Sequence, residues 1–345
     1  MKKLLAAILS LSLAAFSLAG CGASGSSSST DSSASESSQE ASEQVYKIGV
    51  VQLVEHDALD SAYQGFVDGL KEAGYEDGKN IAIDYQNAQG EQANCNTIAS
   101  KFVNDQDDLI LAIATPAAQA AANATTDIPI LVTAVTDPAN AKLVASNEAP
   151  GGNVTGTSDL NPIKEQMDLI KQLVPDVKKV GMLYCSSEAN SEFQVNLAKE
   201  QLETMGIESE DFTVSSTNEI QQVVESMVGK VDAVYVPTDN MIASGIVTVS
   251  AVAVDAKLPV IVAEPWVVKN GGLGTYGLSY YNLGKQTAAM AVKVLTGEAK
   301  PADMPIEYLD EADLMLNQDI IDALGITVPQ ELLDKAEIVT TEKAN

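Results

Sequence analysis

The stretch YKIGVVQL, residues 46–53, is followed by a short polar segment and then by an amphipathic stretch over residues 57–74. The β-branched and apolar residues of 46–53 are typical of a buried strand. Leu59, Phe66 and Leu70 recur at helical spacing in the second stretch, and Gly74 is a natural end for that helix. A strand followed by an amphipathic helix is the repeating unit of a parallel sheet.

The same alternation continues along the chain. After the first strand and helix, we expect strands at 80–85, 109–113 and 128–134 and helices at 91–104 and 116–124. The rhythm then restarts, with strands at 179–184, 211–214, 233–236 and 259–263 and helices at 162–173, 188–205, 219–228 and 241–256. Two successive runs of this kind predict an α/β protein with two doubly wound parallel-sheet lobes joined by a hinge.

The hinge is expected where the chain passes between the two lobes. We predict crossings near residues 156–160 and 275–281, after which a helix at 283–296 returns to the first lobe. The tail at 314–333 is expected to cross a third time, at a point that the sequence does not locate. The predicted organisation is therefore 45–157 plus 281–310 for lobe 1, and 158–280 plus 311–345 for lobe 2.

The N-terminal segment has a different character. Lys2 and Lys3 precede an apolar run that ends in Leu18-Ala19-Gly20-Cys21. This pattern predicts a signal peptide over residues 1–20. The last four residues resemble a bacterial lipobox, which implies a lipid such as palmitate on Cys21 and an extracytoplasmic protein anchored to the cell membrane. Residues 21–44 are rich in Ser and predict a disordered tether.

Composition excludes some classes of partner and site. The chain carries 48 acidic and 20 basic residues, for a formal net charge of −28, which disfavours nucleic acid as a partner. Cys95 and Cys185 can either pair or remain as buried free thiols, and we expect free thiols. His56 is the only histidine, so a His-based metal site or a catalytic triad lacks partners, and we expect an exposed loop position or a polar contact in a cleft.

Ligands of open parallel sheets bind at the carboxyl ends of the strands, so the residues that follow each strand are candidates. In the first lobe, Glu55 follows the first strand, and Thr136 and Asp137 follow the fourth. Thr115 is expected to be the N-cap of the next helix, with Pro116 as its first residue. Capping alone is one interpretation, and a cap whose neighbouring amide groups also hold a ligand carboxylate is the other.

The second lobe offers Asn190, Thr238, Asp239, Asn240 and Glu264 at its strand ends, although each can also be a helix cap. Hydroxyl groups and helix N-termini in the first lobe suit an anion, whereas Asp239 and Glu264 suit a cation. A zwitterion that bridges the lobes fits this division. An apolar wall is expected from about two of five aromatic residues, the others belonging to the core: Tyr184, Trp266, Tyr276, Tyr280 and Tyr281.

Several motifs occur together and in order. They are IGVVQ at 48–52 with Glu55-His56, DYQNAQG at 84–90, AIATPAAQ at 112–119, TAVTDP at 133–138, PGGNVTG at 150–156, YVPTDN at 235–240 and TYG at 275–277. Over residues 47–335 the chain closely resembles the substrate-binding lipoproteins of ABC transporters associated with tryptophan and tyrosine uptake.

The resemblance implies a type I periplasmic-binding-protein fold and a solute-binding component of an ABC importer, not an enzyme. The expected solute is an aromatic or other hydrophobic amino acid. The alternatives are a branched-chain amino acid or a nucleoside, or a lipoprotein that presents its ligand to a signalling receptor. The implied partners are a permease and its ATPase, with the protein itself a monomer and without a cofactor or metal.

The resemblance also implies roles for individual residues. Thr115 and Thr136 would hold the ligand carboxylate, Glu264 or Asp239 would hold its ammonium group, and Ser158 and Asp159 would line the cleft at the hinge. The full set of expected ligand-binding residues is Glu55, Thr115, Pro116, Ala117, Thr136, Asp137, Ser158, Asp159, Asn190, Thr238, Asp239, Asn240, Glu264 and Tyr276.

Overall fold

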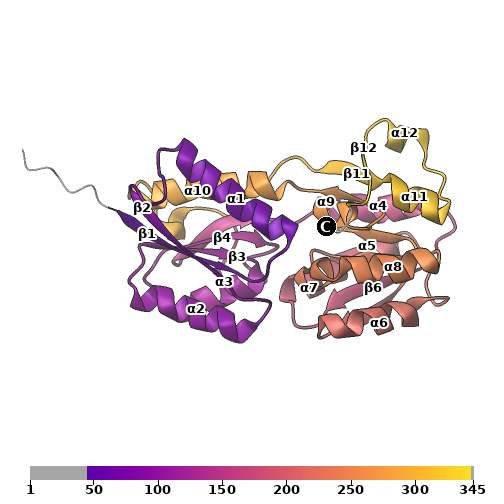
Figure 1. Ribbon diagram of the computed structural model, residues 1–345, viewed down its shortest axis with the longest axis horizontal. Helices are drawn as coiled ribbons and strands as arrows, with labels where there is room; N and C mark the ends of the chain where they lie inside the picture. The colour runs from indigo at the N-terminus through magenta and orange to yellow at the C-terminus, as the bar shows by residue number, and fades with distance from the viewer. Residues whose placement is uncertain (1–44, 343–345) are drawn as a thin grey trace, which may run out of the picture. The chain divides into compact units, whose positions relative to one another are not determined.

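The computed structural model describes residues 45–342, and these residues form two sheets (Figure 1). The first sheet is entirely parallel, has the order β2-β1-β3-β4-β5, and consists of β1 (Tyr46–Gln52), β2 (Ile81–Asn87), β3 (Leu109–Ile113), β4 (Ile130–Val135) and β5 (Val154–Ser158). The predicted signal peptide, Cys21 and the Ser-rich segment lie outside the described residues.

The second sheet has seven strands in the order β12-β11-β10-β9-β8-β6-β7. Its strands are β6 (Lys179–Cys185), β7 (Glu208–Val214), β8 (Ala233–Val236), β9 (Val260–Val262), β10 (Gly274–Gly277), β11 (Asp313–Asn317) and β12 (Glu337–Val339). The pair β10 and β11 is antiparallel, and the other pairs are parallel. The predicted α/β class with two parallel-sheet lobes is confirmed.

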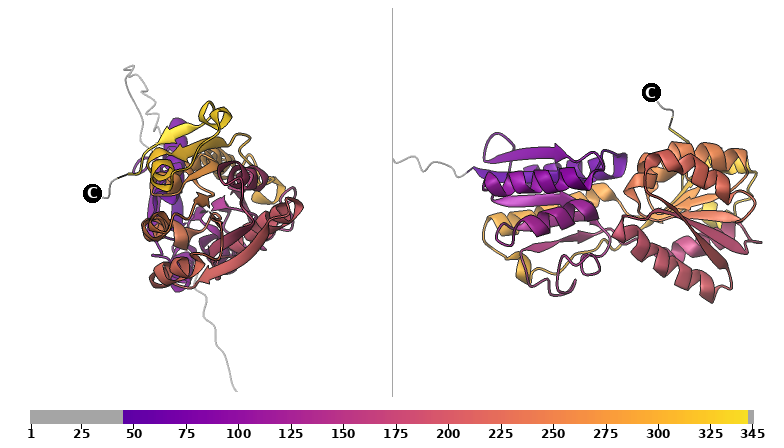
Figure 2. Two further views of the ribbon diagram at one scale, coloured as in Figure 1. Left: turned by 90° about the vertical axis from the view of Figure 1, so that its right-hand side faces the viewer. Right: turned by 90° about the horizontal axis from the view of Figure 1, so that it is seen from below.

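Helices cover both faces of each sheet (Figure 2). The first lobe contains α1 (Asp57–Glu72), α2 (Gln92–Asn104), α3 (Thr115–Ala124) and α10 (Tyr280–Leu295). The second contains α4 (Ile163–Leu173), α5 (Ala189–Thr204), α6 (Ile220–Met227), α7 (Asn240–Ser244), α8 (Ile246–Asp255), α9 (Pro265–Lys269), α11 (Gln318–Leu324) and α12 (Gln330–Leu333). Two short 3-10 helices, η1 (Thr217–Glu219) and η2 (Pro301–Asp303), complete the set. Because the central strands have helices on both sides, strands such as β3 are apolar throughout and fully buried.

Two local predictions need correction. The expected helix over 241–256 is divided into α7 and α8 at Gly245, where a side chain would lie 2.3 Å from the Ile220 Cδ1 atom. Residues 154–158 form a strand, β5, that runs directly into the first crossing, whereas the sequence indicated only a crossing there. Cys95 and Cys185 are buried free thiols, as expected. None of the helices among residues 45–342 has the length and apolar character that a membrane span requires.

Three segments connect the two sheets. The first joins β5 to α4, and the second joins β10 to α10. The third begins after Glu307, which forms an isolated β-bridge with Thr157 of β5. It leads into β11 of the other sheet. Helix α10 thereby returns to the first sheet, where it packs along α1 although more than 200 residues separate them (Figure 1).

The contact between α1 and α10 depends on two glycines. A Cβ atom on Gly284 would lie 1.9 Å from the Ala62 carbonyl oxygen, and one on Gly65 would lie 2.0 Å from the Tyr281 carbonyl oxygen. Both obstacles are backbone atoms, so a side chain at either position would force the helices apart. The returning helix is therefore held in place by backbone-to-backbone approach.

We predict that Gly284→Ala lowers the free energy of unfolding by about 1–3 kcal/mol, the usual cost of overpacking. Urea unfolding measures the effect. The matched control is Gly152→Ala at an exposed position with nothing within 4 Å, which should stay within about 0.5 kcal/mol of the unmodified protein. Equal urea midpoints for Gly284→Ala and the unmodified protein would contradict this close helix contact.

Candidate functional site

Thr115 lies at the start of α3, just beyond the carboxyl end of β3. The predicted N-cap is wrong by one residue, because Ala114 caps the helix with φ of 82° and Thr115 is the first helical residue. The Thr115 hydroxyl makes no capping hydrogen bond and is buried without a partner. The first-turn N–H groups of a helix also lack intrahelical partners. Thr115 and the buried Pro116 and Ala117 therefore present one free hydroxyl and a helix N-terminus.

Glu264 follows β9 and is 2 % exposed. Its Oε2 atom is buried and receives no hydrogen bond. Burial raises the pKa of Glu264 well above its ordinary value, and the charges of Asp159, Asp239 and Glu188 raise it further. This carboxylate is thus surrounded by other acidic groups and lacks a partner of its own.

Asp159 lies on the first crossing and is also buried. The Tyr280 hydroxyl, from the second crossing, donates to Asp159 Oδ2 at 2.7 Å, whereas Oδ1 has no partner. Burial raises the pKa of Asp159. The neighbouring Ser158 donates its hydroxyl to the Thr136 carbonyl oxygen at 2.6 Å, which ties this crossing to the end of β4. Asp159 thus holds one oxygen free at the hinge.

Asp239 has a different environment from Glu264. Its Oδ1 accepts the Ile242 N–H at 2.8 Å and caps α7, and its Oδ2 accepts the Cys185 N–H at 2.6 Å and the Ser191 hydroxyl at 2.7 Å. These donors all come from the second lobe. The arrangement gives Asp239 a structural place, so of the two expected ammonium partners Glu264 is the one whose carboxylate lacks donors.

Glu188 and Gln194 are buried polar residues that the sequence-based site did not include. Glu188 accepts the Asn240 Nδ2 group at 2.6 Å and the Met241 N–H at 3.1 Å, and burial together with Asp239 raises its pKa to about 8. Gln194 donates from Nε2 to the Thr136 hydroxyl of the first lobe at 3.1 Å and accepts the Thr238 hydroxyl at 2.8 Å. The sequence could have indicated Gln194, because it is a polar residue on the face of the helix α5 that packs against the lobe.

Asn190 and Asn240, both expected in the site, flank Glu188. Asn190 donates to the Thr238 carbonyl oxygen at 2.8 Å, and its own Oδ1 is buried without a partner. Asn240 contacts the first lobe, because its Oδ1 lies 3.3 Å from Nε2 of His56. Of the two positions expected for His56, an exposed loop or a polar contact, the structure shows a polar contact.

Two expected site residues, Asp137 and Tyr276, make their contacts elsewhere, and a third, Glu55, lies at the edge of a pocket. Asp137 accepts the Asn140 N–H at 2.8 Å and the Asn147 side chain at 3.3 Å, so it organises its own loop. Tyr276 packs on the core of the second lobe. Burial raises the pKa of its hydroxyl, and the nearby charges of Glu165, Asp168 and Glu331 raise it further. Glu55 is exposed, at the rim of a pocket.

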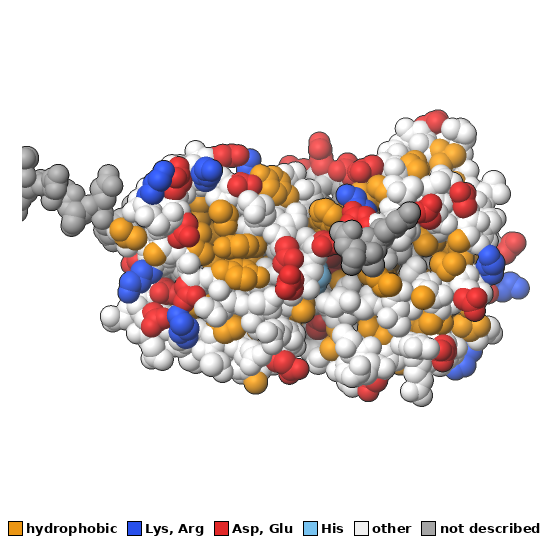
Figure 3. Space-filling model, viewed as in Figure 1, with side chains coloured by type: hydrophobic (Ala, Val, Ile, Leu, Met, Phe, Trp, Pro, Cys, Tyr) orange, Lys and Arg blue, Asp and Glu red, His pale blue; other side chains and the backbone are white. Residues whose placement is uncertain are grey.

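That pocket has a volume of about 210 Å³ and contains residues from both lobes. It is lined by Glu55, His56, Asp57, Ala58, Ala243, Ser244, Ile246, Val247, Glu264, Trp266, Val267 and Asn270. In the space-filling view, the single histidine is visible beside acidic side chains where the lobes meet (Figure 3). The free carboxylate of Glu264 and the indole of Trp266 thus border the same space.

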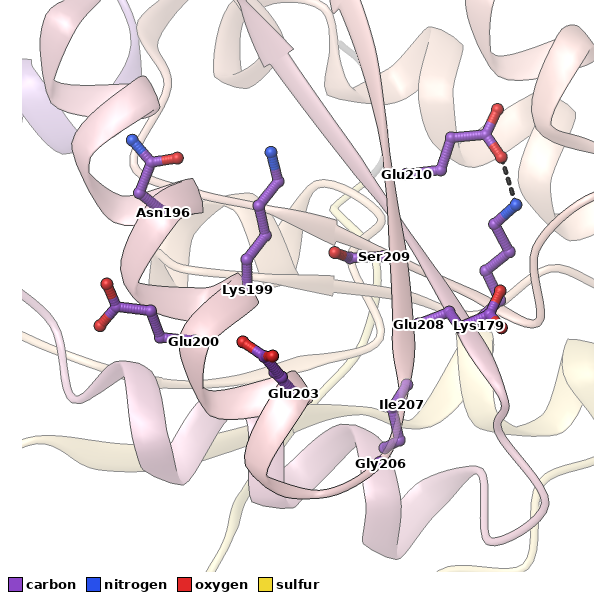
Figure 4. A pocket seen from close by; sticks show the side chains of 10 residues that line it. All are labelled: Lys179, Asn196, Lys199, Glu200, Glu203, Gly206, Ile207, Glu208, Ser209 and Glu210. Atoms are coloured by element: carbon purple, nitrogen blue, oxygen red, sulfur yellow. Dashed lines mark ion pairs between the residues drawn. The ribbon is translucent and has the colours of Figure 1, made fainter.

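A larger hollow of about 980 Å³ lies at the other end of the second sheet (Figure 4). Lys179 and Glu208 begin β6 and β7, so this hollow is at the amino ends of the strands. Its Lys179 forms an ion pair with Glu210. Ligands of parallel sheets bind at the carboxyl ends, so this charged surface is a poorer candidate.

A sequence model for ABC transporter substrate binding proteins matches residues 47–340. The chain belongs to this family. It is thus the solute-binding component of an ABC importer and acts outside the cytoplasm. A tyrosine-binding protein of Clostridioides difficile strain R20291 is 46 % identical over 285 residues, which cover 83 % of this chain and 82 % of that protein.

Two solved structures of related proteins are similar to this substrate-binding protein over most of its length. An ABC domain from Streptococcus pneumonia in complex with L-Trp has a TM-score of 0.83 at 44 % identity, covering 86 % of this chain and 100 % of that one. The ligand-free, open structure of a Clostridium difficile substrate binding protein with adhesive properties has a TM-score of 0.67 at 46 % identity, with the same coverage. At nearly equal identity, the structure thus superposes more closely on the complex with L-Trp than on the ligand-free, open structure.

We predict that Asp239→Asn lowers the free energy of unfolding by about 1–3 kcal/mol without added ligand, because a buried donor loses its acceptor. Glu264→Gln serves as the comparison, since Oε2 of Glu264 has no hydrogen bond to lose and its substitution should not destabilise the protein. Urea unfolding at neutral pH measures both. A greater loss for Glu264→Gln than for Asp239→Asn would contradict the assignment of Asp239 as the structural carboxylate.

Proposed function

We propose that the chain captures an aromatic amino acid between its lobes. Glu264, helped by Asp159, holds the ligand ammonium group, and Thr115 with the first turn of α3 holds the ligand carboxylate. Thr136, Ser158, Asn190, Thr238 and Asn240 form the surrounding polar wall. The observation that carries the proposal is the gathering of unpaired buried polar atoms at the strand ends of both lobes.

Buried polar side chains normally have hydrogen-bond partners, and an unpaired one costs about 1–3 kcal/mol. Among residues 45–342, seven buried side-chain atoms lack a partner. Five of them belong to residues at or just beyond the carboxyl ends of strands: Gln52, Thr115, Asp159, Asn190 and Glu264. A ligand with donors and acceptors at one end supplies the missing partners.

The charges around these atoms favour a zwitterion. The neighbours that raise the pKa of Glu264 are three carboxylates, so the complement on this side is a cation. On the other side, the free Thr115 hydroxyl stands at a helix N-terminus, which attracts an anion. An α-amino acid carries both groups on one carbon atom and can meet both sides at once.

The aromatic class of the side chain is supported by two observations. Trp266 lines the pocket that Glu264 also borders, and an indole is a favourable surface for another ring. One relative is named a tyrosine-binding protein, and one similar structure is a complex with L-Trp. The captured amino acid is then passed to a membrane permease that is driven by its ATPase.

We predict that L-Trp, L-Tyr or both raise the melting temperature in a thermal-shift screen of the twenty amino acids. The protein used begins at residue 45, where the described structure starts. A ligand at about 100 times its dissociation constant adds about 2.7 kcal/mol of stability. The branched-chain amino acids in the screen and an added nucleoside test the alternative ligands. A screen in which no amino acid raises the melting temperature contradicts the proposal.

The same ligand tests the assigned charges. Glu264→Gln should weaken its affinity by more than about tenfold, because the buried ammonium loses its counter-charge. Thr115→Val keeps the shape of the side chain but removes the hydroxyl, and it should also weaken binding. If Glu264→Gln binds normally, the ammonium group is held elsewhere.

The sequence Leu18-Ala19-Gly20-Cys21 supports a lipid anchor on Cys21. We predict that the protein incorporates labelled palmitate in a bacterial host and remains with the membrane fraction, whereas Cys21→Ser is unlabelled and is released from the membrane. Cys95→Ser, which changes a buried thiol instead, should leave both labelling and location unchanged. Labelling of the Cys21→Ser protein would contradict the anchor.

A further inference from the structure

We propose that His56 is a positioning residue that fastens the second lobe over the ligand by donating a hydrogen bond to Asn240, whose amide group is oriented by Glu188. The proposal rests on the proposed function, since it concerns the closure of the same site. His56 itself is not needed to pair with the ammonium or the carboxylate of the ligand.

The position of His56 points its side chain toward the other lobe. The residue precedes α1 in an extended conformation, yet its side chain makes no capping hydrogen bond to that helix. Nε2 of the imidazole instead lies 3.3 Å from Oδ1 of Asn240, which is 184 residues away. The ring thus joins the end of β1 in the first lobe to the start of α7 in the second.

Glu188 decides the direction of this hydrogen bond. Oε2 of Glu188 already accepts the backbone N–H of Asn240 at 3.2 Å, so the donating Nδ2 group of Asn240 faces this same oxygen, at 2.6 Å. The Oδ1 atom of Asn240 is then turned toward His56 and needs a donor. His56 therefore carries its proton on Nε2. The N–H groups of Asn240 and Met241 also donate to Glu188, which fixes Asn240 before the lobes meet.

The charged residues that line the pocket with His56 are acidic, and Lys269 lies close by, with its Nζ atom 4.3 Å from the centre of the Trp266 ring. Glu55 and Asp57 are its neighbours in sequence, Glu264 borders the same pocket, and Glu188 lies behind Asn240. The side chain is partly exposed, but the burial of most of the ring outweighs these charges and lowers the pKa of His56 from 6.5 to about 4. A ligand ammonium beside Glu264 adds a positive charge to the same pocket and opposes protonation further.

Closure is then linked to the protonation of His56. With the lobes apart, the imidazole is in water and has an ordinary pKa of about 6.5. Protonation below that pH favours the open arrangement, because the closed one binds the proton more weakly. The contribution of His56 to affinity is complete above about pH 7 and is lost as the pH falls through 6.5 toward 4.

The test compares the affinity of the protein for its aromatic amino acid with that of His56→Gln, at pH 8 and at pH 5.5, by isothermal titration calorimetry. Glutamine retains an N–H donor for Asn240 but does not titrate. The affinity of the unmodified protein, divided by that of His56→Gln, should be about tenfold lower at pH 5.5 than at pH 8. Titration of Glu188, Asp239 and Glu264 is common to both proteins and cancels in this ratio.

The matched control is Asn270→Ala. This change removes a second hydrogen bond between the lobes, from Asn270 Nδ2 to Asp57 Oδ2 at 3.0 Å, without removing a group that titrates. It should weaken binding by a similar factor at both pH values. A ratio for His56→Gln that does not vary with pH overturns the proposal.

Because His56 is the only histidine, its imidazole NMR signals can be assigned without ambiguity. In the ligand-bound protein its pKa should be well below 6.5 with the proton on Nε2, and a value of 6.5 or above overturns the proposal. If no aromatic amino acid binds at any pH, the proposed function fails, and the closure over the ligand proposed for His56 fails with it. Binding of the amino acid together with a pH-independent ratio for His56→Gln overturns the role of His56 alone.

Discussion

The packing of the two lobes removes the Glu264 carboxylate from water, and its Oε2 atom receives no hydrogen bond from residues 45–342. An unpaired buried charge is among the most costly arrangements in a protein. Ligand capture offers a direct remedy, since an ammonium group supplies both the donor and the counter-charge. In the function proposed above, the burial of Glu264 between the lobes and the binding of a cationic ligand therefore favour each other.

Four buried acidic residues differ in the number of hydrogen bonds that their carboxyl groups accept. Asp239 and Glu188 accept several N–H groups and hold the strand ends of the second lobe together. Asp159 receives one hydroxyl, from Tyr280, and Glu264 receives no bond at Oε2. Asp159 and Glu264, which each keep an oxygen without a partner, are therefore the two that we propose to contact the ligand.

Much of the architecture could be predicted from local pattern. The apolar run 109–113 is β3 with the predicted bounds, and the amphipathic stretch from residue 57 is α1. The predictions were less accurate where a tertiary contact changed the local structure. One predicted helix is divided at Gly245, where the Ile220 side chain leaves no room for a Cβ atom, and Ala114 takes the capping position expected of Thr115.

By itself, the sequence determined the α/β class, the two lobes and the polar residue types that follow each strand, because these depend on spacing within about twenty residues. It could not distinguish the environments of Asp239 and Glu264 or show that Tyr276 packs on the core of the second lobe. Those outcomes depend on which groups lie opposite one another after folding. Gln194 meets Thr136 across 58 residues and His56 meets Asn240 across 184. Only the tertiary structure brings such distant groups within hydrogen-bond range, and the partners found there decide which buried polar groups remain free for a ligand.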